Sequence, residues 1–217
     1  MNKIDHIDHP AVGKSTTVLC ERMLALWMAA LSFLLTGPAF GDSADRAKAI
    51  VTATCATCHG MDGNSVVPTV PKLAGRHPEY IVRELNAFIS GKRKSDIMAP
   101  IAAALDPDDF KPLGVYFGGQ TPTKGTVSDA KAAEAGRKLY LEGNEQSGVP
   151  ACEGCHGTDA QGGKRFPRLA GQHREYLIEQ IYNFRTNVRN TTRVMREVST
   201  RMTDAEIKAV AEFLTGL

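Results

Sequence analysis

A five-residue pattern, Cys-x-x-Cys-His, occurs twice in this chain and constrains its fold more than any other feature. The copies are Cys55-Ala56-Thr57-Cys58-His59 and Cys152-Glu153-Gly154-Cys155-His156. This spacing attaches a c-type haem, because two thiols three positions apart reach the two vinyl groups of one porphyrin and the adjacent histidine then binds the iron. We therefore expect two covalently bound haem c groups. The thioether bonds would come from Cys55, Cys58, Cys152 and Cys155, and one axial iron ligand of each haem from His59 and His156.

A pair of cysteines at this spacing would also fit a redox dithiol or half of a zinc site. Neither alternative explains why a methionine follows each copy at the same distance. Met98 lies 39 residues after His59, and Met195 lies 39 residues after His156. We therefore predict that Met98 and Met195 supply the second axial ligands through their thioether sulfurs.

Met202 is the main alternative to Met195 as a ligand. It aligns with Leu105 at an offset of 97 residues, the offset that also relates the cysteines, histidines and candidate methionines of the two copies. Because leucine there is typical of a core position, we interpret Met202 as packing and Met195 as the ligand. Met98 precedes Ala99-Pro100, a stretch that predicts a loop.

The repeat extends beyond these motifs, so the chain contains an internal duplication. Between the haem motif and the methionine the offset is 96, with Tyr80 answered by Tyr176. Apolar spacing predicts helices and no strands. The expected helices cover residues 45–57, 80–89 and 129–141, followed by closing helices with core positions at Phe110, Leu113 and Phe117 in the first half and Ile207, Val210 and Leu214 in the second.

Both closing helices have start signals. Thr203-Asp204-Ala205-Glu206 has the form of a capping box, and Asp106-Pro107 offers a capping aspartate with proline at the first helical position. Pro112 would lie about six residues inside the first closing helix. There it should cost a backbone hydrogen bond and kink the helix.

The chain opens with an apolar leader. No charged residue occurs from Met23 to Phe40, and small residues follow the apolar run, which predicts a signal peptide over residues 1–41. An uncleaved anchor is the alternative, and it would leave the protein associated with the membrane. In both cases the rest of the chain faces an oxidising compartment, where haem c is attached, so we expect a periplasmic location.

These elements together resemble the dihaem cytochromes c of the cytochrome c4 type. The resemblance covers about residues 42–217 and is most specific in two pairs of segments. These are Pro71-Lys72-Leu73-Ala74-Gly75-Arg76-His77 with Pro167-Arg168-Leu169-Ala170-Gly171-Gln172-His173, and Met98-Ala99-Pro100-Ile101-Ala102 with Met195-Arg196-Glu197-Val198.

The resemblance implies an all-α fold, a tandem duplication of the class I cytochrome c fold with two haem-binding domains related by a pseudo-twofold axis. The expected domains cover residues 42–119 and 129–217, joined by a linker over 120–128. By analogy with small cytochromes, Pro71 and Pro167 would present their carbonyls to the free ring nitrogens of His59 and His156. Alternatively, each proline only stiffens its loop.

The symmetric ligand set favours an electron-transfer protein without catalytic residues. The resemblance implies electron delivery to a membrane terminal oxidase, with a quinol-oxidising complex as the expected donor. Two alternatives remain: the cytochrome subunit of a dehydrogenase complex, and a dihaem peroxidase-like enzyme, which needs an iron site able to open. Nucleic-acid binding has no support, because the net charge is only +2 and no aromatic platform occurs.

Other recurring residues have weaker interpretations. His77 and His173 recur in step, and we interpret them as surface or capping residues rather than iron ligands. Two basic groups could neutralise haem propionates, form a docking patch or simply be solvated. They are Lys92-Arg93-Lys94 and the series Arg185, Arg189, Arg193 and Arg196.

Overall fold

The computed structural model describes residues 41–217, and the predicted leader, up to Phe40, lies outside the described residues. Within this part the regular structure is helical, and the only β pairings are the isolated bridges Arg93↔Arg189 and Asn144↔Val149. Among the described helices, none has the length and apolar character needed to cross a bilayer. The all-α prediction is therefore confirmed.

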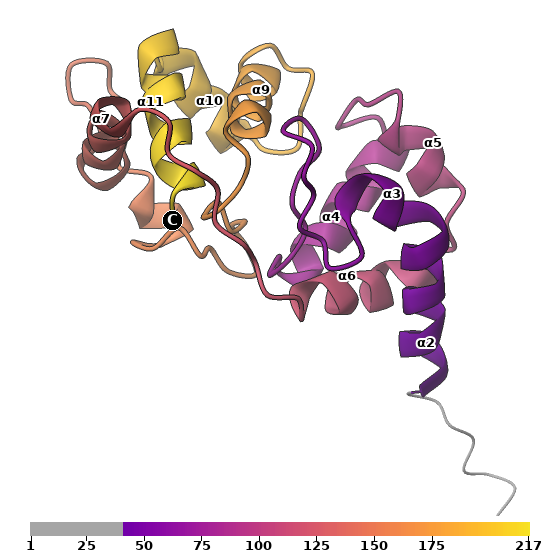
Figure 1. The fold of residues 1–217 in the computed structure, drawn as a ribbon. Coiled ribbons are helices and arrows are strands. Elements are labelled where there is room, and N and C mark those ends of the chain that lie inside the picture. Colours follow the sequence, from indigo (N-terminus) through magenta and orange to yellow (C-terminus); the bar gives the residue numbers. More distant parts are fainter. Residues whose placement is uncertain (1–40) are drawn as a thin grey trace, which may run out of the picture. The chain divides into compact units, whose positions relative to one another are not determined.

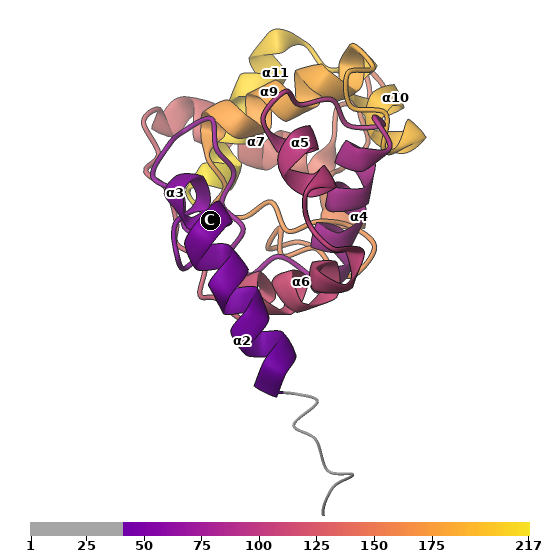
Figure 2. The ribbon, with the colours of Figure 1, turned by 90° about the vertical axis from the view of Figure 1, so that its right-hand side faces the viewer.

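The helices form two groups that repeat one order (Figure 1). In the first, α2 (Gly41–Ile50) continues through a π-helical turn (Val51–Cys55) into α3 (Ala56–His59), followed by α4 (Pro78–Ile89), α5 (Met98–Ala103), a 3-10 turn (Pro107–Asp109) and α6 (Phe110–Gly118). The second contains α7 (Ala130–Glu142), α8 (Glu153–His156), α9 (Arg174–Arg185), α10 (Arg193–Arg201) and α11 (Asp204–Thr215). Figure 2 shows α2 leading up to α3, with α4, α5 and α6 beside them.

Each group has its own hydrophobic core. The predicted core positions of the closing helices are all at most 3 % exposed, as expected from their spacing. The first core also contains Ala47, Val51, Ile81, Leu85, Phe88 and Ala102. The second also contains Leu139, Tyr140, Val149, Ala160, Ala170, Leu177, Met202 and Ala211. Two separate cores in sequential halves are what a tandem duplication requires.

The capping box at Thr203 is confirmed, whereas the Asp106-Pro107 signal starts a 3-10 turn that precedes α6, and the expected effect of Pro112 is wrong. Thr203 and Glu206 form the capping box at the start of α11, and the Asp106 side chain accepts a hydrogen bond from the Asp108 N–H. Because α6 begins only at Phe110, Pro112 lies in the first turn. The N–H groups of a first turn have no partner within the helix, so proline loses no hydrogen bond there.

The predicted methionine loop is also wrong, since Met98 is the first residue of a short helix, α5. Pro100 does not prevent this helix, because it too lies in a first turn. Met195 lies inside α10. Both candidate methionines are therefore presented from helices.

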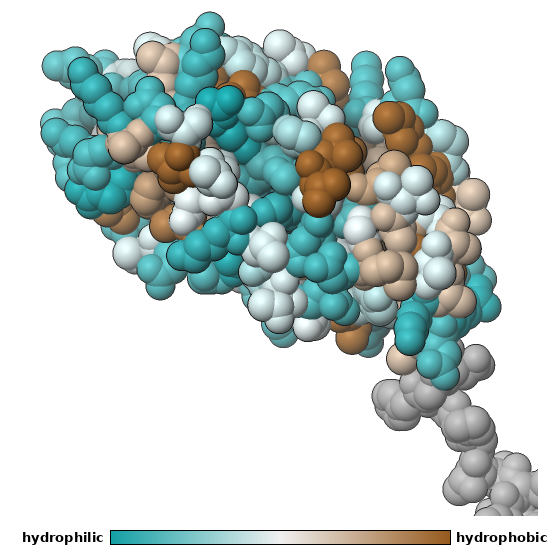
Figure 3. Space-filling model, in the orientation of Figure 1, coloured by the Kyte–Doolittle hydropathy of each residue, from teal (hydrophilic) through white to brown (hydrophobic). Residues whose placement is uncertain are grey.

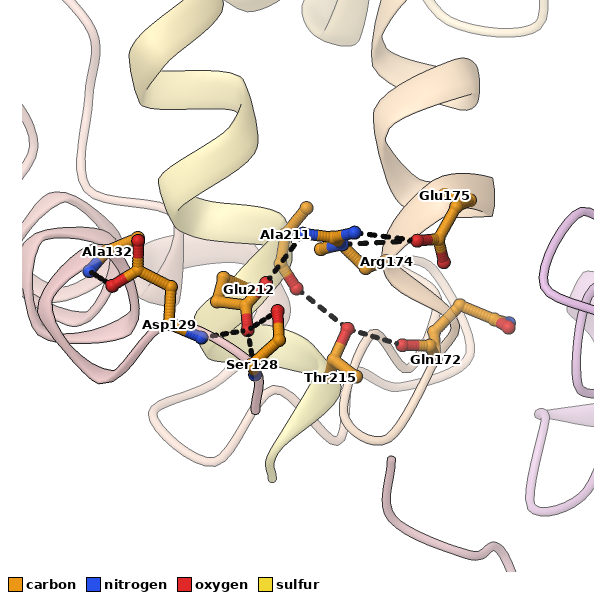
Figure 4. A network of polar contacts seen from close by, with 9 residues as sticks. All are labelled: Ser128, Asp129, Ala132, Gln172, Arg174, Glu175, Ala211, Glu212 and Thr215. Atoms are coloured by element: carbon orange, nitrogen blue, oxygen red, sulfur yellow. Dashed lines mark hydrogen bonds and ion pairs between the residues drawn. The ribbon is translucent and has the colours of Figure 1, made fainter. Parts of the chain in front are cut away.

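The buried carboxylate of Glu212 ties the start of the second half to its closing helix (Figure 4). Its Oε1 accepts hydrogen bonds from the backbone N–H of Ser128 and, at 2.9 Å, from that of Asp129. Its Oε2 faces Arg174 Nη1 at 3.2 Å. Burial raises the pKa of Glu212, but the two N–H donors and Arg174 lower it by more. The carboxylate therefore remains charged and holds α7, α9 and α11 together.

Candidate functional site

The histidine of the first motif is held by a backbone carbonyl. His59 ends α3 and is 7 % exposed, and its Nδ1 lies 2.9 Å from the Pro71 carbonyl oxygen. A carbonyl oxygen only accepts hydrogen bonds, so Nδ1 carries the proton and Nε2 keeps its lone pair. Burial lowers the pKa of His59, and the charge of Arg93 adds to this. A neutral imidazole with a free Nε2 is the form that binds a metal.

The second motif repeats this arrangement. His156 ends α8 and is 6 % exposed, and its Nδ1 lies 2.9 Å from the Pro167 carbonyl oxygen. Burial lowers the pKa of His156, and here the contributing charge is Arg76. The two sites therefore present the same histidine tautomer.

A backbone clamp places each proline carbonyl. In the first half, the N–H groups of Leu73 and Ala74 both donate to the Gly63 carbonyl, at 2.7 and 3.1 Å. In the second half, the corresponding N–H groups donate to the Ala160 carbonyl, at 2.8 and 3.1 Å. Gly63 and Ala160 both have positive φ, 72° and 52°. The repeated Leu-Ala-Gly segment thus fastens the proline loop beside the histidine.

The cysteines of each motif lie one helical turn apart, on the same side of the chain. Cys58 and Cys155 are exposed, Cys55 and Cys152 are half-buried, and none of the four forms a disulfide. Burial raises the pKa of Cys55, and it raises that of Cys152 to about 11. In the described part of the chain, no three His, Cys, Asp or Glu side chains gather closely enough to hold a metal ion.

The three methionines under discussion differ in burial. Met202 is 6 % exposed and belongs to the second core. Met98 and Met195 are half-buried, and the Met98 N–H donates to Ser95 Oγ at 3.0 Å. Met202 is thus already used in packing. The pairing of Met98 with His59, and of Met195 with His156, stays a prediction.

The two basic groups named in the sequence analysis each contain both exposed and buried residues. Lys92, Lys94, Arg193 and Arg196 are exposed, whereas Arg93 and Arg189 are buried. Neither basic group is therefore a continuous surface patch. The alternating exposure follows from the sharp turns that come after α4 and α9, which direct Arg93 and Arg189 inward.

Contacts between the halves were missed at the sequence level. Gln172 Oε1 accepts from the Lys72 N–H at 2.9 Å, and Gln172 Nε2 donates to the Lys72 carbonyl at 3.1 Å. His173, the residue before α9, places Nε2 2.8 Å from the Ser65 carbonyl oxygen. The sequence offered one signal for these contacts, namely that Gln172 and His173 recur, at an offset of 96 residues, as the counterparts of Arg76 and His77.

Comparisons with known proteins agree with this geometry. The family model described as Cytochrome c matches residues 44–113 and 133–217. A cytochrome c4 from Thiocapsa roseopersicina is 41 % identical over 83 % of this chain and 95 % of its own length. The crystal structure of reduced recombinant cytochrome c4 from Pseudomonas stutzeri superposes with a TM-score of 0.75 at 32 % identity, covering 80 % of this chain and 98 % of that one. A thiosulfate dehydrogenase electron acceptor from Stutzerimonas stutzeri (strain A1501) is 35 % identical over 75 % of this chain and 78 % of its own length.

Proposed function

Because this chain belongs to the cytochrome c family, in its dihaem cytochrome c4 group, we propose that it carries electrons in the periplasm from a quinol-oxidising complex to a membrane terminal oxidase. Proteins of this group transfer electrons and are not enzymes. The two haem c groups, attached at the repeated motifs, each supply a one-electron iron couple. The partners and the compartment are our proposal.

The residues proposed to hold each haem come from one half of the chain. In the first half they are Cys55 and Cys58 as thioether donors, with His59 and Met98 as axial ligands. In the second half they are Cys152, Cys155, His156 and Met195. Pro71 and Pro167 keep the proton on Nδ1 of each histidine, so that Nε2 remains available.

The observation that carries the proposal is the equality of the two histidine sites. Both Nδ1 atoms lie 2.9 Å from a proline carbonyl oxygen. A carrier needs two closed sites that exchange electrons, whereas a peroxidase needs one site that opens to peroxide. Two sites built alike, each with a half-buried methionine in the same half, support the carrier over the peroxidase.

Oxygen uptake tests the carrier function. The holoprotein should restore oxygen uptake to membranes that contain a haem-copper oxidase and have been depleted of soluble cytochromes. Rapid reduction of peroxide by the half-reduced protein, with no restored uptake, would contradict the proposal.

The location is tested by mass spectrometry of the periplasmic fraction, where we expect a mature chain that begins near Asp42.

A second candidate donor is a thiosulfate-oxidising dehydrogenase, because one relative bears the name thiosulfate dehydrogenase electron acceptor. This would make the chain the redox partner, or the permanent cytochrome subunit, of such an enzyme. Affinity purification of the tagged holoprotein from the periplasm discriminates between a permanent subunit and a mobile carrier. A permanent subunit elutes with a catalytic partner in a fixed ratio, whereas a mobile carrier elutes alone.

A further inference from the structure

A cluster of six polar residues, five of them buried and Tyr80 half-buried, joins α4 and α9 across the two halves. Tyr80 and Glu84 lie one turn apart on α4, and Tyr176 and Gln180 take the same places on α9. The other two members, Arg93 and Arg189, follow these helices. The Arg93 N–H returns to the Ala87 carbonyl and the Arg189 N–H to the Asn183 carbonyl, both at 2.9 Å. Each pair of corresponding residues is separated by 96 positions.

The arginine contacts in this cluster are reciprocal. Arg93 Nη2 donates to Tyr176 Oη at 2.6 Å, and Arg189 Nη2 donates to Tyr80 Oη at 2.9 Å. Each guanidinium also stacks on a phenylalanine of its own half, 4.5 Å from the Phe88 ring centre for Arg93 and 4.6 Å from that of Phe184 for Arg189. Each arginine therefore packs within its own half and donates to the other.

One position breaks this symmetry. Glu84 Oε2 accepts from Arg93 Nη1 at 2.7 Å and from Arg189 Nη2 at 2.8 Å. At the corresponding position, Gln180 Oε1 accepts from both arginines at 3.1 Å. The carboxylate and the amide thus make the same pattern of contacts, but only the carboxylate carries charge.

Burial makes this difference in charge decisive. The side chains of Arg93, Arg189 and Glu84 are only 10 %, 6 % and 12 % exposed. Two guanidinium ions that share a poorly solvated site repel each other, the buried Arg76 nearby adds to this repulsion, and a carboxylate between Arg93 and Arg189 opposes it. Removal of one partner from a buried ionic group leaves uncompensated charge, which is strongly destabilising.

We propose that the Glu84 carboxylate is the positioning group that fixes the orientation of the two haem-binding halves, and that position 180 can hold this charge equally well. The inference deepens the proposed function, because electron exchange between two haems depends on their separation, which the orientation of the halves sets. It concerns the contact between the halves, and it can be tested without any electron donor or acceptor.

Three variants separate charge from shape. Glu84→Gln keeps the acceptor oxygen but removes the charge. The double variant Glu84→Gln/Gln180→Glu returns the charge from the other half. Glu79→Gln is the matched control, because Glu79 lies on the same helix and faces Lys164 of the other half at 3.7 Å, but the pair is exposed and exposed pairs contribute little.

Amide hydrogen exchange of the reduced holoprotein provides the measurement. The Lys94 N–H donates to the Val188 carbonyl at 3.2 Å, and the Asn190 N–H donates to the Lys92 carbonyl at 2.6 Å, so both amides report on the contact between the halves. The Gly75 and Cys152 amides, bonded to Phe117 and Tyr140 of their own halves, serve as internal references.

In Glu84→Gln, the Lys94 and Asn190 amides should exchange at least about tenfold faster than in the wild type, while the reference amides change little. The double variant should restore the wild-type rates, and Glu79→Gln should not alter them. Unchanged rates in Glu84→Gln would overturn the proposal, as would a double variant that exchanges as fast as Glu84→Gln. If Glu84→Gln does not fold, the double variant decides: wild-type rates support the proposal, and failure to fold overturns it.

Discussion

In the first half Met98 begins a short helix of alanine, proline and isoleucine, whereas in the second half Met195 stands in α10 among Arg193, Arg196 and Glu197. On the histidine side the halves do not differ in this way, since each imidazole lies 2.9 Å from its proline carbonyl. The comparison teaches that duplication has preserved the geometry that sets the histidine tautomer. The helix that carries the methionine occupies the same place in the order of both halves, but its length and its residues differ.

The two halves also differ in how many large apolar side chains they expose. Large exposed apolar side chains are more frequent in the first half, where Val66 is 90 % and Ile97 is 69 % exposed. In the second half Val194, beside Met195, is 55 % exposed, but its neighbours on α10 are charged. Figure 3 shows hydrophilic side chains over much of the face that carries the second half. Similar internal sites are therefore enclosed by unlike exteriors.

Removal of one histidine should have the largest effect and should be confined to one half. His156→Ala removes the proposed ligand of the second site but leaves the first core and the His59–Pro71 contact intact. We expect the ferrous spectrum to retain one normal six-coordinate haem per chain and to lose the other. His59→Ala is the mirror experiment, and loss of both haems in either variant would show that the sites are not independent.

Methionine substitution sharpens the comparison where the halves differ most. If Met98 and Met195 are both axial ligands, Met98→Ala and Met195→Ala should each remove about half of the weak near-infrared sulfur-to-ferric-iron band. Met202→Ala is the control, because Met202 lies in the second core and its loss should lower stability without removing the band. A full band in Met195→Ala would transfer the ligand role to Met202.

Glu212→Ala should weaken only the second half. It leaves two N–H donors, the Ser128 hydroxyl and Arg174 without their shared acceptor, so we expect a loss of about 3 kcal/mol in the free energy of local unfolding. Hydrogen exchange within α7 and α11 measures it, with α4 and α6 as references. Glu175→Ala, which removes an exposed partner of Arg174, should cost about 0.5 kcal/mol or less. Equal destabilisation of both halves would contradict the assignment.

The contact between the halves should weaken only in acid. Burial raises the pKa of Glu84, but Arg189 and Arg93 lower it by more, so it lies below the ordinary value. Besides the two tyrosines of the cluster, Arg76 lies close to the two arginines, and the charge of Arg93 also acts on His59. A depressed folded pKa means that the stabilisation is complete above about pH 4.3 and is lost as the pH falls through the folded pKa. Exchange at the Lys94 and Asn190 amides, corrected for intrinsic rates, should rise there in the wild type. Exchange in Glu84→Gln should lack this step.

The parts of this account that were predictable from sequence share a local cause. The haem motifs, the capping box at Thr203 and the core spacing of α6 and α11 each involve residues within a few turns of one another, so short-range rules suffice. The predictions for Pro100 and Pro112 were wrong because proline is tolerated in the first turn of a helix and disruptive further inside it. The sequence does not show at which residue each helix begins. The Arg93 and Arg189 cluster was missed because its partners come from the other half. Only the fold brings them together.

Carbon monoxide binding to the fully reduced holoprotein tests the central claim most directly, that this chain carries electrons through two closed and equivalent sites. If both irons keep histidine and methionine, carbon monoxide at neutral pH should leave the Soret spectrum unchanged, and Met98→Ala or Met195→Ala should each allow binding at one haem per chain. Binding to one haem of the wild-type protein would reveal an open iron site and contradict the carrier account.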